Sequence, residues 1–184
     1  MTTLLEHPEV QALVNRMSLA DYHRLAELGL LPEKIELIDG VLINKMPKSP
    51  KHAFTVDYLL SIFRNIFREN FIIRSEQPLS IGNSEPEADI SIIPGALIDF
   101  RNSHPDTARL AVEISVSTYE LDYQKQFIYA DALVPEYWII NLKEKELEVY
   151  KNPSSGKYLE KKIFRSSDTV ELEGTKISLQ TILE

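Results

Sequence analysis

Acidic side chains interrupt three otherwise apolar stretches of this sequence. Glu36 stands in IELIDG, Asp89 in PEADISII and Glu113 in LAVEISVST. A carboxylate in a buried strand loses its water, which is costly unless something compensates. Close carboxylates also raise each other's pKa, so proteins tolerate them chiefly when a cation lies between them. The pattern therefore favours a divalent-cation site, and all-oxygen ligands suit Mg²⁺ or Mn²⁺.

A lysine follows the third acid on the next stretch of the chain. Lys125 lies in YELDYQKQFIYADALV, which we predict to be a helix. A lysine beside a metal can stabilise developing negative charge or position a water nucleophile. Asp89, Glu113, Lys125 and a divalent cation would together suit metal-assisted hydrolysis of a phosphodiester bond.

These residues also have simpler interpretations. Each acid, taken alone, could lie at a strand edge or form a structural salt-bridge network with Arg74 or Arg109. Lys125, taken alone, is typical of a solvated helix residue. The spacing within the strands argues for a shared site, because residues two apart point to the same face. Asp89 then shares a face with Ser91, and Glu113 with Ser115.

The elements that would position these residues can be predicted from periodicity and turn signals. Helices are expected over 18–28, 51–69 and 119–134, with Ser18 capping the first and Gly29 ending it. Asp39-Gly40 predicts a hairpin within 35–46. We expect strands over 71–81, 86–94, 110–115, 136–141, 147–151 and 157–164. This order predicts an α/β domain with a central mixed sheet flanked by helices.

Composition limits the class of protein. The chain has 184 residues, 43% of them hydrophobic, which suggests one domain over 18–184 after a poorly patterned segment 1–17. We expect no membrane span and no secretory signal. Cysteine is absent from the sequence, which fits the cytoplasm. The net charge of −8 lowers the expectation of tight non-specific DNA binding.

Other catalytic patterns are missing. The four histidines lack zinc-site spacing, and the sequence contains neither a glycine-rich phosphate loop nor a Gly-x-Ser-x-Gly motif. Lys45, Lys48 and Lys51 form the only basic cluster close to a proposed acid, Glu36. If DNA binds, we expect these lysines to contact its phosphates.

Several of these stretches together resemble the Uma2 family of putative restriction endonucleases, within the PD-(D/E)XK nuclease superfamily. The matching stretches are IELIDGVLINKMPKSPKH, SEQPLSI, PEADISII, LAVEISVST, D..K...YA and VPEYWIINL. Their order and spacing cover about residues 18–182. The resemblance implies a restriction-endonuclease-like core, here with an extra N-terminal helix and a C-terminal β-hairpin.

The resemblance also implies site residues. Asp89 falls at the first superfamily acid, Glu113 at the second, and Glu36 at the acid that often precedes the core sheet. All three would hold the metal. The usual lysine position is Ser115, so the family lysine has moved to the next helix, where Lys125 matches by its spacing to Tyr129.

Three assignments remain open at this point. The spacing from Asp122 to Lys125 is one residue shorter than the family's, so Gln126 could take the lysine position instead. His52 matches a recurring histidine that could line the cleft, or it could be a helix residue without chemistry. Gln77 could contact a phosphate or orient a water, or only satisfy the backbone at a strand end.

We therefore expect a Mg²⁺-dependent DNA endonuclease, with Mn²⁺ as the alternative cation. Asp89, Glu113, Glu36 and Lys125 would be catalytic, and Gln77, His52, Lys48 and Lys51 would bind the substrate. The competing hypothesis is a catalytically inactive nuclease-fold module that acts in DNA binding or protein interaction. A hydrophobic edge such as LEVY could allow a homodimer.

Overall fold

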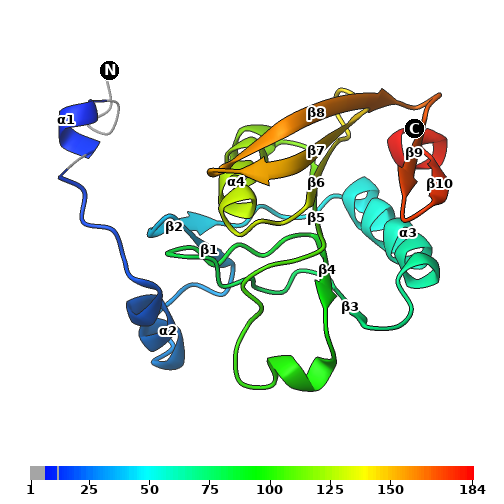
Figure 1. The fold of residues 1–184 in the computed structure, drawn as a ribbon. Coiled ribbons are helices and arrows are strands. Elements are labelled where there is room, and N and C mark those ends of the chain that lie inside the picture. The colour runs from blue at the N-terminus through cyan, green and yellow to red at the C-terminus, as the bar shows by residue number, and fades with distance from the viewer. Residues whose placement is uncertain (1–6, 12) are drawn as a thin grey trace.

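The computed structural model describes residues 7–11 and 13–184, and its fold is shown in Figure 1. These residues form a six-stranded central sheet. Its strands, in spatial order, are β3 (Phe71–Arg74), β4 (Ile90–Pro94), β5 (Leu110–Ser115), β6 (Glu136–Asn141), β7 (Glu146–Ser154) and β8 (Lys157–Arg165). All neighbouring pairs are antiparallel except β5 and β6, which are parallel. The predicted mixed sheet is therefore confirmed.

The other elements lie around this sheet. The helices are α1 (Pro8–Gln11), α2 (Leu19–Glu27), α3 (Pro50–Ile66), the short 3₁₀ helix η2 (Leu97–Phe100), α4 (Tyr119–Asp131) and α5 (Gln180–Leu183). Two separate hairpins in the described part pair β1 (Ile35–Ile38) with β2 (Val41–Asn44) and β9 (Thr169–Leu172) with β10 (Thr175–Ser178). Within the described ranges, no helix is both long enough and apolar enough to span a membrane.

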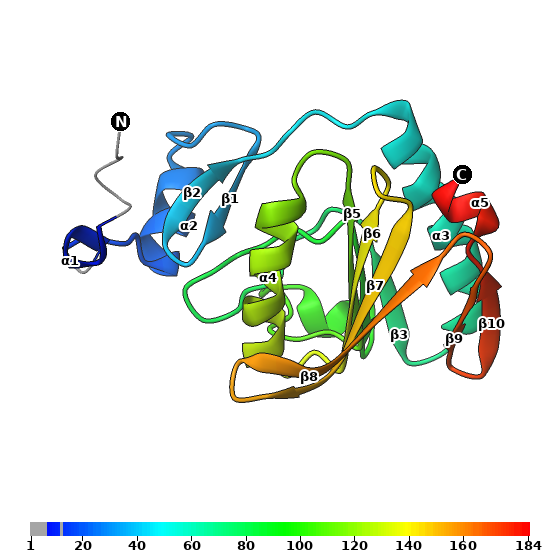
Figure 2. The same ribbon diagram turned by 90° about the horizontal axis from the view of Figure 1, so that it is seen from above.

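Helices cover both faces of the sheet, as the view from above shows (Figure 2). The α4 helix packs on one face, while α3, α5 and the β9–β10 hairpin lie on the other. Side chains along β6 alternate between these two layers. Trp138 packs with Phe63 on the α3 side, and Tyr137 packs with Tyr129 on the α4 side. Because both faces are covered, β5 and β6 are buried along their whole length.

Local signals in the N-terminal half give the predicted elements. The Ser18 side chain caps α2 by accepting a hydrogen bond from the Asp21 N–H. The β1–β2 turn has positive φ angles at Asp39 (49°) and Gly40 (72°), as a tight two-residue turn requires. The predicted helix over 51–69 is α3, and Phe54 on this helix is 53% exposed.

Two predictions about strands are wrong in detail. The strand predicted over 71–81 ends at Arg74, because Glu76 adopts a positive φ of 54° and Pro78 follows. The LEVY stretch lies inside the sheet, in β7 between β6 and β8, and is not an edge. The expected C-terminal hairpin is present as β7–β8, whose strands also belong to the central sheet, while the β9–β10 hairpin nearer the C-terminus was not predicted. The predicted segment 1–17 lies partly outside the described residues.

Candidate functional site

Adjacent strands bring the first two acids together. In the β4–β5 pair, Ile90 lies opposite Val112. One step further in this antiparallel register, Asp89 lies opposite Glu113, just before β4 begins. The Ile114 N–H donates to Asp89 Oδ2 at 2.8 Å, which ties the two chain segments together at this point.

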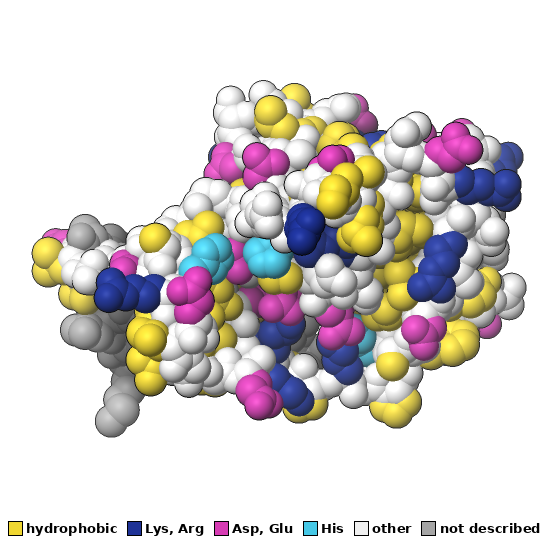
Figure 3. Space-filling view, turned by 90° about the horizontal axis from the view of Figure 1, so that it is seen from below, with side chains coloured by type: hydrophobic (Ala, Val, Ile, Leu, Met, Phe, Trp, Pro, Cys, Tyr) yellow, Lys and Arg dark blue, Asp and Glu magenta, His cyan; other side chains and the backbone are white. Residues whose placement is uncertain are grey.

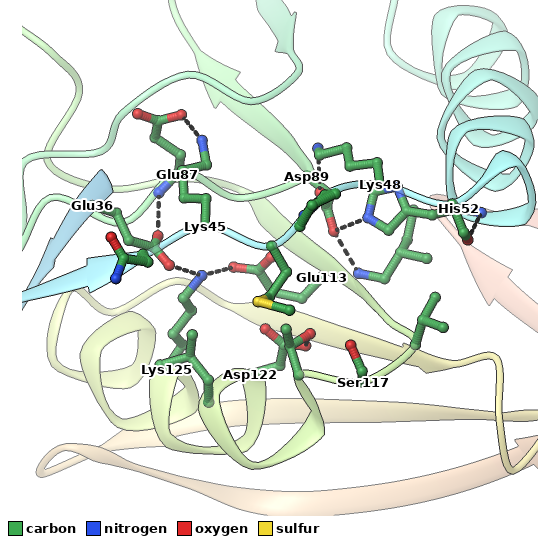
Figure 4. A pocket seen from close by; sticks show the side chains of 18 residues that line it. Glu36, Lys45, Lys48, His52, Glu87, Asp89, Glu113, Ser117, Asp122 and Lys125 are labelled. Atoms are coloured by element: carbon green, nitrogen blue, oxygen red, sulfur yellow. Dashed lines mark hydrogen bonds and ion pairs between the residues drawn. The ribbon is translucent and has the colours of Figure 1, made fainter. Parts of the chain in front are cut away.

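A buried ion cluster surrounds Glu113. Lys125 Nζ lies 3.2 Å from Glu113 Oε1 and 2.9 Å from Glu36 Oε1. The Tyr129 hydroxyl donates to the same Glu113 oxygen at 3.0 Å. Figure 4 shows Lys125 reaching from α4 to a point between the two acids. The sequence did not show that one lysine would bind both Glu36 and Glu113.

Helical spacing explains how α4 supplies these groups. Asp122, Lys125 and Tyr129 are three and four residues apart, so they lie on one face of the helix. That face packs against the sheet, where Glu113 projects from β5. Gln126 points elsewhere, since its amide donates to the backbone carbonyl of Tyr123. The structure therefore places Lys125, and not Gln126, beside the acids.

Burial and charge have opposite effects on this cluster. Burial raises the pKa of Glu113 well above its usual value, and the Lys125 ammonium offsets only part of this effect. Burial alone would lower the pKa of Lys125, but Glu113 and Glu36 outweigh it and raise that pKa. Lys125 consequently stays charged at neutral pH. Its 4% exposure leaves few conformations open to the side chain.

Asp89 has a different set of partners from Glu113. Lys48 Nζ lies 3.0 Å from Oδ1, and His52 Nε2 lies 3.1 Å from Oδ2, which also accepts the Ile114 N–H. Burial alone would raise the pKa of Asp89, but His52, Lys48 and the backbone N–H together lower it. Asp89 is thus held as a carboxylate by groups that converge on it (Figure 4).

Asp122 is an acid of the cleft that was not assigned to the site from the sequence. Asp122 is 4% exposed and accepts a 2.7 Å hydrogen bond from the Thr118 hydroxyl. Burial raises its pKa to about 6, against the opposing effects of Lys125 and Thr118. The signal was its position one helical turn before Lys125, which puts both side chains on the face that meets the sheet.

Two expected substrate-binding residues lie elsewhere. The Gln77 side chain is exposed and accepts a hydrogen bond from Arg74 Nε. Lys51 donates to the backbone carbonyl of Glu184. Neither lines the cleft. The alternative salt-bridge network is not found with the named arginines either, since Arg109 pairs with Glu136 and Glu173.

The acids line one cleft between the 45–49 segment and the start of α4. Its ionisable lining groups are Glu36, Lys45, Lys48, His52, Glu87, Asp89, Glu113, Asp122 and Lys125. Lys45 pairs with Glu87, whose backbone N–H donates to Glu36 Oε2 at 3.1 Å. Both Glu36 oxygens are therefore occupied, so its placement suits holding Lys125 better than binding a metal.

Asp89 and Glu113 form a donor set that fits a hard divalent cation. Mg²⁺ commonly binds through one or two carboxylates and keeps several waters. In the described part of the chain, no three acidic or histidine side chains are arranged to enclose a metal. Of the two Glu113 oxygens, Oε1 accepts Lys125 and Tyr129, while no side chain in the described ranges donates to Oε2. A two-carboxylate site completed by water is therefore the arrangement that fits.

Comparisons with known proteins agree with this architecture. A model of the Uma2 family, described as "Putative restriction endonuclease", matches residues 19–182. A similar solved structure is the "Crystal structure of a putative nuclease belonging to DUF820 from Anabaena variabilis ATCC 29413", with a TM-score of 0.70 and 18% identity. The match covers 86% of this chain and 96% of that chain. At this identity the likeness concerns the fold alone. A search of curated proteins gives no match.

Proposed function

The chain belongs to the Uma2 family of restriction-endonuclease-like proteins, and from this premise we propose that it is a divalent-metal-dependent DNA endonuclease. Nucleases of this kind generally use divalent metal ions. One observation carries the proposal: Asp89 and Glu113 lie across adjacent strands, and Lys125 is held on Glu113 by a 3.2 Å contact. Mg²⁺ as the cation, with Mn²⁺ as the alternative, belongs to the same proposal.

Asp89 and Glu113 would hold the cation through Asp89 Oδ1 and Glu113 Oε2. When bound, the cation would polarise the scissile phosphate and acidify a water. His52 and the Ile114 N–H keep Asp89 ionised and fix its orientation from the other oxygen. Glu36 would act as a positioning residue, because it fixes Lys125 from the side opposite Glu113.

Lys125 has one donor to spare. An ammonium carries three N–H groups, and Glu36 and Glu113 accept two of them. The third can donate to a phosphate oxygen or to the attacking water. Because the side chain is clamped by two acids, this donor would need no rearrangement when substrate arrives, which is the condition for strong electrostatic stabilisation.

Asp122 is our candidate for the proton acceptor. A pKa of about 6 leaves it mostly ionised at neutral pH, yet still basic enough to take a proton from water. It lines the same cleft as Asp89 and Glu113. Thr118 holds one of its oxygens at 2.7 Å, which orients the carboxylate.

Cleavage assays test this proposal. Plasmid and single-stranded DNA would be incubated with wild-type protein, Asp89→Asn, Glu113→Gln and Lys125→Met in Mg²⁺ or Mn²⁺. We expect each variant to lose activity by about 10² or more, as when a preorganised charged group is removed. The matched control is Asp57→Asn, which changes an exposed carboxylate on α3. Variants that cleave like the wild type would disprove the assignment.

An inactive nuclease-fold module is the second candidate. The observation that favours it is that Lys48 and Lys125 already occupy oxygens of Asp89 and Glu113. Under this alternative, the wild type would bind DNA or a protein partner without cutting, and chelating divalent cations would not change binding. A homodimer and a cytoplasmic location remain part of our proposal, and a measurement of molecular size in solution tests the homodimer.

A further inference from the structure

The two lysines that contact the proposed metal ligands differ in how they are held. Lys125 is buried on α4, with 4% of its side chain exposed. Lys48 lies in the segment between β2 and α3, and 30% of its side chain is exposed. Its Nζ lies 3.0 Å from Asp89 Oδ1 and 2.7 Å from Glu76 Oε1. Lys48 can therefore leave Asp89 without opening the core, whereas Lys125 cannot leave Glu113.

The net charge of the cleft favours the replacement of Lys48 at Asp89 by a divalent cation. Its lining holds five carboxylates and three lysines, so two negative charges are formally in excess. One divalent cation would balance them. A cation bound to Asp89 Oδ1 would also repel the Lys48 ammonium that now occupies this oxygen.

We propose that Lys48 is an exchangeable counter-ion of Asp89, displaced when a divalent cation binds and thereby freed to hold a phosphate oxygen of the DNA. This inference rests on the proposed function. Glu76 remains beside Lys48 as an alternative partner at the rim, since it is 44% exposed. His52 and the Ile114 N–H stay on Asp89 Oδ2, so only one oxygen changes partner.

The charge state of Lys48 agrees with this role. Burial alone would lower its pKa, but Asp89 and Glu76 outweigh burial and raise it. The side chain is thus an ammonium while it contacts Asp89 and Glu76. Cation and DNA would then bind with positive coupling, because the first releases the group that the second requires.

Calorimetric titration of Mn²⁺ and Mg²⁺, without DNA, tests the first half of the exchange. Lys48→Met should bind the cation about two- to fivefold more tightly than the wild type, the range expected for losing a half-exposed competing ion pair. Lys48→Arg retains the charge and should stay near the wild-type affinity. The control is Lys51→Met, whose Nζ contacts the Glu184 carbonyl outside the cleft.

Fluorescence anisotropy tests the second half. The probe is a labelled DNA duplex with uncleavable phosphorothioate linkages, titrated with and without Mn²⁺. In the wild type the cation should strengthen DNA binding, and Lys48→Met should lose most of this gain while Lys51→Met keeps it. Circular dichroism at matched concentrations shows that each variant is folded.

The outcomes separate this inference from the proposed function. If the wild type binds Mn²⁺ and Asp89→Asn does not, the metal site stands. Equal or weaker Mn²⁺ binding by folded Lys48→Met would then overturn the exchange alone. If the wild type binds neither cation, both proposals are overturned.

Discussion

At the scale of single residues, the buried acids and lysine depend on one another. Glu36, Glu113 and Lys125 are each at most 4% exposed. Burying a charge pair costs free energy, and breaking such a pair costs about 3–5 kcal/mol more because one charge is left unpaired. A buried ion cluster of this kind contributes little net stability to the fold. Its presence in the core therefore favours a role in the site.

The pKa of Asp122 gives a prediction about pH. Because the folded-state pKa is about 6 and the ordinary value is 3.8, the folded protein binds the proton more tightly than the unfolded chain. Wild-type stability should therefore fall as pH rises from about 4 to 6. Asp122→Asn has no carboxyl group to ionise at this position, so its stability should not fall in this way. The free energy of unfolding of the variant should therefore exceed that of the wild type by about 1–3 kcal/mol above pH 6.

Urea unfolding at a series of pH values measures this difference. At about pH 3 and below, the two proteins should differ little, because Asp122 is then protonated in both the folded and the unfolded state. The same variant should lose cleavage activity by roughly 10²-fold, as expected for a lost proton acceptor. Gains in stability with unchanged activity would assign Asp122 a purely structural role.

At the scale of elements, the β1–β2 hairpin determines where Glu36 lies. Gly40 accepts a hydrogen bond from the Met17 N–H and donates one to the Asn83 carbonyl, so the turn is fixed to its surroundings. A Cβ at Gly40 would lie 2.6 Å from Arg16 Cβ and 2.9 Å from the Met17 carbonyl oxygen. No side chain fits there unless the hairpin shifts.

Gly40→Ala should therefore destabilise the protein more than Gly29→Ala. Both glycines have positive φ, 72° and 66°, so both substitutions introduce similar backbone strain. A Cβ at Gly29 would meet nothing within 4 Å. We expect a cost of about 1 kcal/mol at Gly29 and about 2–4 kcal/mol at Gly40, measured by chemical denaturation. Equal costs would show that the turn adjusts freely.

At the scale of the whole molecule, the cations near the site are paired. The space-filling view of Figure 3 shows basic and acidic side chains interspersed over the face drawn there. Lys45 pairs with Glu87, and Lys48 with Glu76 and Asp89. Together with a net charge of −8, this pairing limits the number of phosphates that the protein can neutralise.

DNA binding should therefore depend weakly on salt. If Lys45 and Lys48 supply the phosphate contacts, the plot of log affinity against log salt concentration should have a slope of about −2. Anisotropy titrations over a range of NaCl concentrations, at constant free Mn²⁺, measure it. A slope of about −6 or steeper would mean that an extended basic surface binds the DNA and that these two lysines are a minor part of it.

The sequence by itself determined the elements and the candidate acids. The apolar run LAVEIS predicted β5, its single acid drew attention to Glu113, and Asp39-Gly40 predicted the first hairpin. These signals are local, because side-chain period and turn conformation depend on neighbouring residues. The same signals failed where tertiary packing prevails, as in the shortened β3 and in the LEVY stretch, which lies inside the sheet and not at its edge.

Only the tertiary structure decided how the acids are partnered. Lys125 reaches Glu36 and Glu113 because α4 packs on the sheet face from which Glu113 projects. The spacing of these residues along the chain does not predict that contact. Packing likewise brought Lys48 and His52 to Asp89 and left Gln77 and Lys51 outside the cleft. Burial then set the charges, since desolvation depends on what surrounds a group and not on its neighbours in sequence.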